Sequence, residues 1–344
     1  MHQKRIAIVI LNWNGKNYLE KFLPSVEANS SGSDVGIFVA DNGSTDDSVS
    51  FLKNHFPAVQ LILLEKNYGF AEGYNLALKE IEADYFILLN SDVEVTQGWL
   101  MPIIEYMDSN PNVAACMPKI RSFAGRDYFE YAGAAGGFLD KFGYPFCRGR
   151  IMSEIEKDNN QYNDIKDIFW ASGASMFVRA SIFNEVNGLD GDFFAHMEEI
   201  DLCWRMKNRG YSIRYFGHST VYHVGGGTLP NNNPRKLFFN YRNNLLLLAK
   251  NLAPGKLIPI IMLRMIFDGL SASVYLCTFQ LMFFLAVFKA HIGFYRMLPN
   301  VLKKRKELNK FNAQYKHQEI FNRSIIYYFF ILNKRNFNEL NFYL

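Results

Sequence analysis

Four short, mostly apolar segments in the first third of the 344-residue chain constrain the fold more than any other feature. They cover residues 6–11, 35–41, 59–65 and 85–89, and a stretch with helical periodicity follows each of them. Strands that are apolar on both sides are typical of a parallel sheet, because its crossover helices shield both faces from water. The pattern therefore predicts an α/β fold with a mostly parallel central sheet and helices on both faces.

Each of these predicted strands is followed by a polar cluster. The clusters are Asn12–Gly15, Asp41–Ser48, Glu65–Asn75 and Asn90–Asp92. Taken singly, each is also typical of an ordinary turn or helix cap. The carboxyl ends of parallel strands share one edge of the sheet, where ligands of open α/β sheets bind and where helix N-termini favour anions. Together the clusters predict a site for a nucleotide or another phosphorylated ligand.

The first cluster does not match the glycine patterns of two common nucleotide-binding folds. Only Gly15 follows the first strand, so the G-x-G-x-x-G pattern of dinucleotide-binding domains is missing, as is a G-x-x-x-x-G-K-[ST] loop. The carboxylate of Asp41 suits either a ribose hydroxyl or the N–H of a pyrimidine base. An NAD-dependent enzyme is therefore disfavoured.

Charge is unevenly distributed along the chain. Residues 300–344 hold nine Lys or Arg and three Glu, whereas the formal charge of the whole chain is only +4. This basic segment predicts an anionic partner, and we expect a membrane rather than nucleic acid because no recognised nucleic-acid-binding fold accompanies it. The four cysteines form no C-x-x-C pair, which fits a reducing cytoplasm. The apolar run 6–11 is too short for the core of a signal peptide.

The most apolar part of the chain, residues 257–288, precedes the basic segment. Within it, Gly269–Phe288 has no charged residue and is long enough to cross a bilayer. A membrane span, helices lying in the interface, and a buried hairpin or dimer interface all stay open. A span would place Lys303–Lys306 outside the cytoplasm, against the positive-inside tendency, and Arg264 and Asp268 favour the interface. We expect a peripheral or monotopic association with the cytoplasmic face of the plasma membrane.

Several ordered motifs span roughly residues 4–228. They are VILNWNG, VADNGSTDDS, NYGFAEGYN and FILLNSDVEV, followed by GASMFVRASIFNEVNGLDGDFFAHMEEIDLCWRMKNRGY and VYHVGGGT. Together they resemble the family 2 glycosyltransferases, and most closely the bacterial rhamnosyltransferase-like branch. The resemblance implies the GT-A fold, with a catalytic domain at 1–230 that has a donor half at about 1–118 and an acceptor half at about 119–230. Residues 231–344 are then expected to be a C-terminal helical region that associates with the membrane.

The resemblance also implies an inverting, divalent-metal-dependent glycosyltransferase. Its donor would be a nucleoside-diphosphate sugar, such as dTDP-rhamnose or a UDP-sugar, and its acceptor a glycan or a lipid-linked molecule in cell-surface polysaccharide synthesis. Such a transfer needs a neutralised leaving diphosphate, a base for the acceptor hydroxyl and an in-line geometry. The alternative is a catalytically impaired nucleotide-sugar-binding or scaffolding module of a membrane assembly complex. Whether the chain forms a homodimer is left open.

Asn90, Ser91 and Asp92 match this branch's version of the Asp-x-Asp motif. The match implies Asp92 as the carboxylate ligand of Mg²⁺ or Mn²⁺, ions that prefer oxygen ligands. Asn90 would contact the ribose or the diphosphate. His223 matches the family position that often supplies a second metal contact. A hydrogen bond to the diphosphate and a purely structural role are the other interpretations of this histidine.

The general base is expected in the segment HMEEIDLCWR. Glu199 matches the family position where an Asp usually acts as base, so the glutamate is a departure that extends the carboxylate by one methylene; Glu198 is the alternative. On a helix, Glu198 and Asp201 share a face with Arg205, so an ion-pair ladder is a competing interpretation. Stabilisation of the two carboxylates by the helix dipole is another.

The remaining motif matches imply contacts to the two substrates. The expected donor contacts are Asn12, Asn14, Asp41, Asn42, Ser44, Asn67, Gly69, Phe70, Asn75, Asn90 and Ser91. The expected acceptor contacts, on a strand that forms the floor of the site, are Trp170, Gly173 and Ala174. Phe70 suits the core equally well, because it opens a predicted amphipathic helix. His196 and His218 are expected to be surface or packing residues.

Overall fold

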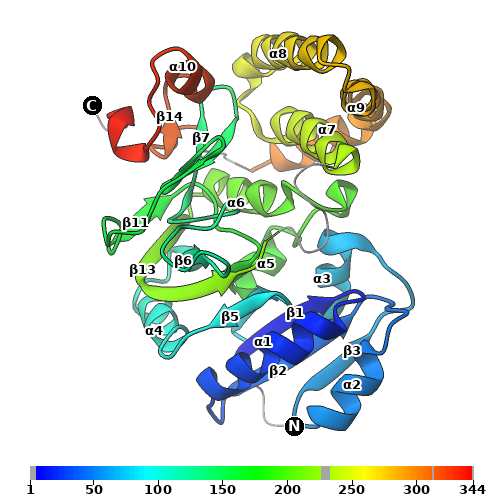
Figure 1. Ribbon diagram of the computed structural model, residues 1–344, viewed down its shortest axis with the longest axis vertical. Coiled ribbons are helices and arrows are strands. Elements are labelled where there is room, and N and C mark those ends of the chain that lie inside the picture. Colours follow the sequence, from blue (N-terminus) through cyan, green and yellow to red (C-terminus); the bar gives the residue numbers. More distant parts are fainter. Residues whose placement is uncertain (1–4, 226–232, 312–313, 343–344) are drawn as a thin grey trace.

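The computed structural model describes residues 5–225, 233–311 and 314–342. Its centre is a mixed sheet with the strand order β11-β13-β6-β12-β4-β1-β2-β3, and β5 pairs with β13 beside this path (Figure 1). The strands are β1 (Ile6–Asn12), β2 (Val35–Asp41), β3 (Gln60–Leu63), β4 (Tyr85–Asn90), β5 (Val93–Val95), β6 (Val113–Ser122), β11 (Ile165–Ile168), β12 (Ser175–Arg179) and β13 (Ser212–His223).

The strands β4, β1, β2 and β3 form the parallel part of the sheet. Ile6 lies opposite Val35 and Tyr85, and the register continues without a break to Asn12, which lies opposite Asp41. The strands therefore end level at one edge. The helices that follow them are α1 (Lys16–Asn29), α2 (Ser48–His55), α3 (Gly69–Lys79) and, after β5, α4 (Met101–Ser109). The predicted strand–helix alternation and the parallel pairing are confirmed for these strands.

The other half of the sheet has mixed directions. β12 runs antiparallel to both β4 and β6, whereas β13 is parallel to β6 and antiparallel to β11 and β5. Between β12 and β13 lie α5 (Ala180–Glu185), the 3-10 helix η1 (Gly191–Phe193) and α6 (Glu198–Asn208). His223, the last residue of β13, pairs with Val93, the first residue of β5. This pairing brings the end of β13 beside Asp92.

A second, smaller sheet has the order β10-β9-β8-β7-β14. Its strands are β7 (Gly137–Asp140), β8 (Pro145–Cys147), β9 (Arg150–Ile151), β10 (Glu154–Ile155) and β14 (Ile320–Phe321). The first two, β7 and β8, pair antiparallel as a hairpin. The helices α10 (Ile325–Phe330) and η3 (Phe337–Leu340) follow β14 (Figure 1), and the rings of Phe138 and Phe337 lie 5.0 Å apart. The C-terminal tail, predicted as a basic segment for a membrane, thus packs against this sheet.

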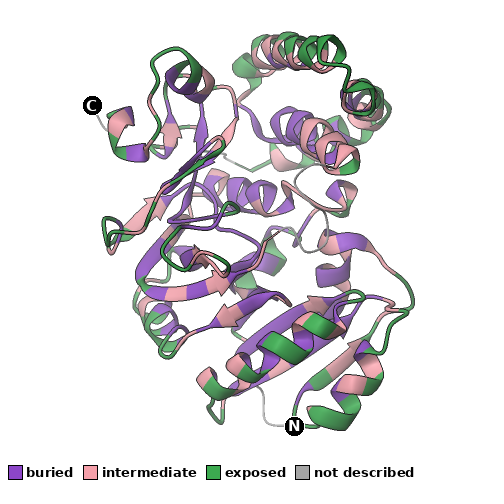
Figure 2. Ribbon diagram, in the orientation of Figure 1, coloured by how far each residue is buried: buried purple, intermediate pink, exposed green. Residues whose placement is uncertain are grey.

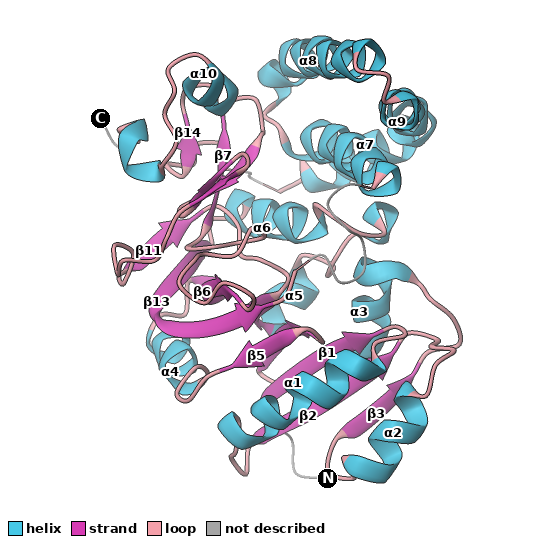
Figure 3. Ribbon diagram, in the orientation of Figure 1, coloured by secondary structure: helices cyan, strands magenta, loops and turns pink. Residues whose placement is uncertain are grey.

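The C-terminal helices are α7 (Pro234–Asn251), η2 (Pro254–Lys256), α8 (Leu257–Cys277) and α9 (Leu281–Leu308), joined by loops (Figure 3). Residues 243–251 of α7 are all buried, whereas α8 and much of α9 are exposed (Figure 2). Thr278–Gln280 separates α8 from α9, so Gly269–Phe288 is not one continuous helix, and the alternative of a single span over these residues is excluded. By length and composition alone, Pro254–Cys277 and Leu281–Leu308 each suit a membrane span. The domain boundary predicted at 230–231 lies outside the described residues.

Candidate active site

Polar side chains at the carboxyl ends of β1 and β2 bond to one another. Nδ2 of the buried Asn12 donates to Oδ2 of Asp41 at 3.1 Å and to Oγ of Ser44 at 3.3 Å. The backbone N–H of Asn14 also donates to Oγ of Ser44, at 2.9 Å. Oδ1 of Asn12 is buried and has no hydrogen-bond partner. Leaving a buried acceptor unsatisfied costs about 1–3 kcal/mol, so this atom suits a donor group of a ligand.

Asn42 holds the turn that precedes α3. Its Nδ2 donates to the carbonyl oxygen of Gly69 at 3.0 Å and to Oδ1 of Asn67 at 3.3 Å, and its Oδ1 accepts from the backbone N–H of Tyr68 at 3.0 Å. Oδ1 of Asn67 also accepts from the backbone N–H of Gly69, at 2.8 Å. These predicted donor contacts therefore fix the shape of the turn, and their contact with a nucleotide stays a prediction.

Asp92 follows β4 and lies next to the last residue of β13. Its Oδ1 is 3.1 Å from Nε2 of His223, and Nδ2 of Asn90 is 3.4 Å from the same nitrogen. Nδ1 of His223 is 3.4 Å from Oε2 of Glu130, a buried residue that was not selected from the sequence. The structure thus places a buried imidazole between two buried carboxylates, with Asn90 alongside.

Burial and neighbouring charges shift the pKa values of His223 and Asp92 in opposite directions. Burial would lower the pKa of His223, but the carboxylates of Glu130 and Asp92 outweigh it and raise that pKa to about 10. Burial would raise the pKa of Asp92, yet the neighbouring His223 holds it below its usual range. Asp92 is therefore an anionic carboxylate at neutral pH, which is the form that binds a metal ion.

Asp92 offers an anionic carboxylate oxygen to a cation. His223, with a pKa of about 10, is an imidazolium at neutral pH, so Nε2 would become a metal ligand only when a cation displaces its proton. In the described ranges, no group of three or more His, Cys, Asp or Glu side chains is arranged to hold a metal ion. Mg²⁺ is usually held by one or two carboxylates together with the phosphates of a substrate, rather than by a complete protein cage. The carboxylate of Asp92 therefore fits a divalent ion that would take most of its other ligands from a diphosphate and water, with His223 joining once its proton has left.

Glu198 and Glu199 open α6 directly after Met197, whose backbone is left-handed with φ 75°. Oε2 of each glutamate is buried without a hydrogen-bond partner. Burial raises the pKa of Glu199 to about 7, and burial together with Glu199 raises the pKa of Glu198 well above its usual range. A carboxyl group that titrates near neutral pH is suited to accept a proton in catalysis.

Gly173, a predicted acceptor contact, lies beside Phe70, a predicted donor contact, and beside Glu199. A Cβ atom added to Gly173 would lie 3.1 Å from Cζ of Phe70 and 3.9 Å from Cβ of Glu199. Any larger residue at this position would therefore fill the space between the Phe70 ring and the glutamate. The absence of a side chain keeps that space open, as expected where a substrate approaches the backbone closely.

Three predicted contacts are occupied by the protein's own packing. The indole N–H of Trp170 donates to the carbonyl oxygen of Phe138 at 3.1 Å, and the carbonyl oxygen of Ala174 accepts from the backbone N–H of Asn90. Both residues are buried in the loop between β11 and β12, so the prediction of a strand there is wrong. The side-chain amide of Asn75 bonds to the backbone of Leu189 at 2.7 and 3.0 Å. Substrate contact by these three residues stays a prediction that their placement does not favour.

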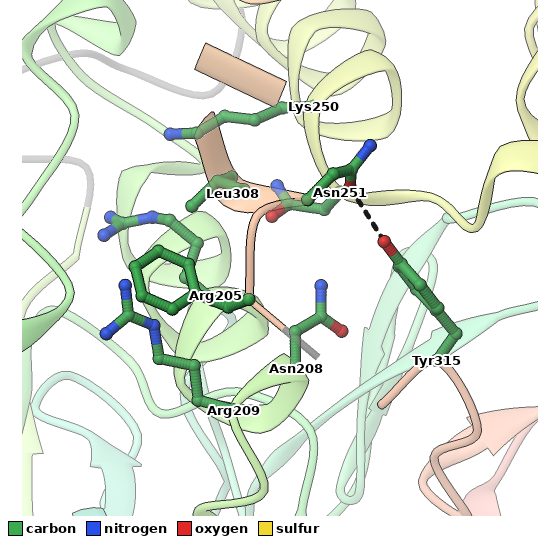
Figure 4. A pocket seen from close by; sticks show the side chains of 9 residues that line it. Arg205, Asn208, Arg209, Lys250, Asn251, Leu308 and Tyr315 are labelled. Atoms are coloured by element: carbon green, nitrogen blue, oxygen red, sulfur yellow. Dashed lines mark hydrogen bonds between the residues drawn. The ribbon is translucent and has the colours of Figure 1, made fainter. Parts of the chain in front are cut away.

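Asp201 anchors α6 to the C-terminal helices. Its carboxylate accepts from Nε of Arg205 at 2.7 Å, Nζ of Lys250 at 2.8 Å and Nδ2 of Asn251 at 2.7 Å. The predicted pairing of Asp201 with Arg205 is confirmed, and Oε2 of Glu198 is left unpaired. A cavity of about 20 Å³ borders this network, and Figure 4 shows Arg205, Lys250 and Asn251 lining it. It has room for about one water molecule and includes none of the predicted site residues.

The comparison with known proteins decides the family. The sequence pattern of glycosyl transferase family 2 matches residues 7–186, which is more than half of the chain. The chain belongs to glycosyl transferase family 2. The predicted family resemblance and the prediction of a glycosyltransferase are both confirmed.

Two bacterial rhamnosyltransferases are similar to this chain in sequence. The N-acetylglucosaminyl-diphospho-decaprenol L-rhamnosyltransferase of Mycobacterium tuberculosis is 24% identical over 232 residues, which is 63% of this chain and 75% of that protein. Rhamnosyltransferase WbbL of Escherichia coli K12 is 26% identical over 219 residues, which is 61% of this chain and 80% of that protein. The chain is therefore similar to the rhamnosyltransferase-like branch of family 2.

The crystal structure of GalNAc-T7 with UDP, GalNAc and Mn²⁺ has a similar fold. It aligns with a TM-score of 0.55 and 13% sequence identity over 72% of this chain, and the chain spans about half (48%) of that structure. An identity this low shows the fold alone. The prediction of a GT-A fold with a central α/β sheet is confirmed for this family 2 glycosyltransferase.

Two buried polar residues near the predicted site residues were not selected from the sequence. Glu130 lies in a Gly- and aromatic-rich segment without periodicity, and no sequence signal marks it as a partner of His223. Asn243 lies inside α7 next to a second asparagine, Asn244. Asparagine is a poor residue for a helix interior, so two adjacent buried asparagines were a signal that their side chains hold other segments.

Proposed function

We propose that this family 2 glycosyltransferase uses a nucleoside-diphosphate sugar as donor, with a divalent cation held by Asp92 and His223. The observation that carries the proposal is the 3.1 Å approach of Asp92 Oδ1 to His223 Nε2 at the edge where β1, β2 and β4 end. Asn12 and Asp41 lie at the same edge and suit the nucleoside. When bound, Mg²⁺ or Mn²⁺ supplies positive charge that stabilises the leaving diphosphate.

In this proposal Glu199 is the general base. Its carboxylate takes the proton of the acceptor hydroxyl while the acceptor oxygen forms a bond to the anomeric carbon of the sugar. The bond from that carbon to the diphosphate breaks, and the diphosphate leaves with the electron pair. Because the two oxygens lie on opposite sides of the carbon, the reaction inverts the anomeric configuration. Gly173 supports this role by keeping open the space beside Glu199.

The α8 helix supports a lipid-linked acceptor at a membrane surface. Its buried residues are the charged Arg264 and Asp268, so its polarity is the reverse of that of a helix exposed to water. The apolar side chains that it exposes are Ile258, Met262, Ile266, Leu270 and Val274, each at least 58% accessible. Their spacing of four residues makes them one stripe along the helix. An unpartnered apolar stripe of this length suits the acyl boundary of a bilayer.

The α9 helix adds positive charge beside apolar residues. Phe288, Ile292 and Tyr295 are exposed, and so are Lys289 and Arg296. Lysine and arginine next to an apolar face favour anionic lipid headgroups. We therefore place the α8–α9 hairpin in the interface of the cytoplasmic leaflet. The name of the Mycobacterium tuberculosis relative, which specifies a diphospho-decaprenol substrate, supports an acceptor of the same chemical class.

The test uses the purified full chain with a panel of nucleotide sugars that includes dTDP-rhamnose and UDP-hexoses. Each is offered with a polyprenyl-diphosphate-linked sugar, with Mn²⁺ or Mg²⁺ and with EDTA. We expect one donor to be consumed only with the ion, giving a product with inverted anomeric configuration by NMR. Retained configuration, or equal transfer in EDTA, would contradict the proposed mechanism.

A further inference from the structure

The turn that leads into α6 is strained. Phe194, His196 and Met197 have φ angles of 63°, 70° and 75°, in the left-handed region that non-glycine residues rarely adopt. Such residues cost about 1–3 kcal/mol each and persist only where neighbouring groups hold them. Met197 directly precedes Glu198, so the conformation of this turn sets the direction in which the two glutamates enter the site.

One buried side chain of α7 binds this turn at three points. Nδ2 of Asn243 lies 2.9 Å from the carbonyl oxygen of Phe193, 2.8 Å from that of Ala195 and 2.7 Å from that of His196. Two amide hydrogens are thus shared among three acceptors. Nε of Arg242 donates to Oδ1 of Asn243 at 2.9 Å, which directs the amide nitrogen toward the turn. Nη2 of Arg242 adds a bond to the carbonyl oxygen of Phe193 at 3.1 Å.

The opposite side of the turn rests on the start of α3. The backbone N–H of Phe70 donates to the carbonyl oxygen of Phe194 at 2.7 Å. Gly69 has φ 80°, and a Cβ atom there would lie 2.6 Å from the ring of Phe194. The turn is therefore held between the donor-side motif at Gly69 and the Asn243 amide on α7.

We infer that Asn243 is a positioning residue for the reaction: it holds the strained turn that sets the place of Glu199. The inference rests on the proposed function, because it takes Glu199 to be the base. Asn243 itself lies beyond residues 7–186, the part of the chain matched by the family pattern. The C-terminal helical region thus takes part in building the active site as well as carrying the apolar hairpin.

The decisive variant is Asn243→Asp, which keeps the shape of the side chain but cannot donate to the three carbonyl groups. Asn244→Ala is the matched control: Asn244 is also buried in α7, but its Nδ2 bonds to the carbonyl oxygen of Gly143 at 3.0 Å, in the β7–β8 turn. We expect Asn243→Asp to lower kcat by about 10–100-fold, part of what a general base contributes. Donor KM and donor binding with Mn²⁺ should change much less than kcat, because Asn12, Asp41 and Asp92 are held by bonds that do not involve Asn243.

A merely structural role would not move the pH profile. If the turn relaxes in Asn243→Asp, Glu199 gains water and meets an added carboxyl group, so the acidic limb of kcat should move from its wild-type position, whereas Asn244→Ala should keep the wild-type limb. Arg242→Ala is a milder variant, for use if Asn243→Asp does not fold, and it should change kcat in the same direction by less. The inference is wrong if the folded Asn243 or Arg242 variant keeps the wild-type kcat and the wild-type acidic limb of the pH profile. It is also wrong if Asn244→Ala lowers kcat and moves the limb as much as Asn243→Asp does.

The variant Glu199→Gln tests the proposed base separately from the positioning role of Asn243. If Glu199→Gln itself keeps the wild-type activity and pH limb, then Glu199 is not the base and the proposed function fails at that point. If Glu199→Gln loses activity while Asn243→Asp behaves as wild type, the proposed function stands and the positioning role of Asn243 is overturned. The two variants therefore separate the two claims.

Discussion

Oδ1 of Asp92 lies 3.1 Å from Nε2 of His223, although 131 residues separate the two in the sequence. The contact depends on the antiparallel pairing of β5 with β13, in which His223 lies opposite Val93. The sheet therefore assembles the proposed metal-binding pair before any ligand arrives. Such preorganisation lowers the reorganisation needed when a cation and a diphosphate bind.

Asp92→Asn should abolish metal-dependent catalysis while leaving the fold intact. The amide keeps the size of the carboxylate but removes its negative charge, so the ion loses its one anionic protein ligand. We expect transfer to fall at least about 100-fold, since charge stabilisation of this kind contributes several kcal/mol. Calorimetry should show that Mn²⁺ no longer strengthens nucleotide binding. Asp127→Asn, at a carboxylate that is 70% exposed, is the charge-matched control; wild-type activity of Asp92→Asn would refute the metal site.

The rate of transfer should depend on one group that titrates near neutral pH. Burial raises the pKa of Glu199 to about 7, and a base acts only when deprotonated, so kcat should rise with pH and level off above about 7. The thiols of Cys147 and Cys203 interact with Glu199 but stay neutral in this range, because burial raises the pKa of both. Glu199→Gln should lose about 10²–10⁴-fold in kcat and the acidic limb with it. If the acidic limb of the pH profile is unchanged in Glu199→Gln, the limb belongs to another group, and Glu198 is the first residue to replace in order to find it.

The same glutamate should lower stability at alkaline pH. Its pKa is about 7 in the folded chain and near 4.5 when unfolded, so the folded state holds the proton more tightly. The stability it contributes is fully present below pH 4.5 and is lost as pH rises through 7. Glu199→Gln should therefore match the wild type in urea unfolding at pH 4.5 and exceed it by about 1–3 kcal/mol at pH 8. If the wild type and Glu199→Gln are equally stable at both pH values, burial does not raise the pKa of the Glu199 carboxyl group.

The parallel half of the fold could be predicted because its residues carry local signals. The apolar runs of β1, β2 and β4 specify strands that are buried on both faces, whereas β3 is a half-exposed edge strand. The polar residues after these runs, such as Asn12 and Asp41, must then share an edge. Asp92 could be selected by the same argument. These statements need only the alternation of strands and helices, and no knowledge of distant contacts.

The contacts between distant segments could not be predicted. Glu130 meets His223 only because β13 and the segment after β6 are brought together, and nothing in its own neighbourhood marks it. The position of the break at Thr278–Gln280 could not be predicted, because an apolar run with uniform composition hides a turn between two helices. Asn75 and Trp170 were matched to substrate contacts by their motif positions, yet their polar atoms bond to backbone groups that fold back from elsewhere.

Gly69 should tolerate a methyl group less well than Gly98. Both glycines have positive φ, 80° and 73°, so alanine strains the backbone equally at either position. At Gly98 a Cβ atom meets nothing within 4 Å, whereas at Gly69 it lies 2.6 Å from the ring of Phe194. Gly98→Ala should cost about 1–3 kcal/mol from strain alone. Gly69→Ala should cost more and also lower kcat, because it pushes the turn before Glu198; equal loss of stability with full activity would contradict this.

The apolar stripe of α8 should bind lipid bilayers rather than a second copy of the chain. Replacing Met262, Ile266 and Leu270 by Ser removes apolar surface that is at least 58% exposed at each position, so the fold should lose little stability. Sedimentation with vesicles that contain phosphatidylglycerol should show strong binding of the wild type, and binding at least about tenfold weaker for the triple variant. Leu63→Ser, at an apolar residue that is 56% exposed on β3, is the matched control and should bind as the wild type does. A wild-type chain that ignores vesicles but sediments as a dimer, and becomes a monomer in the triple variant, would instead assign this stripe to a protein interface.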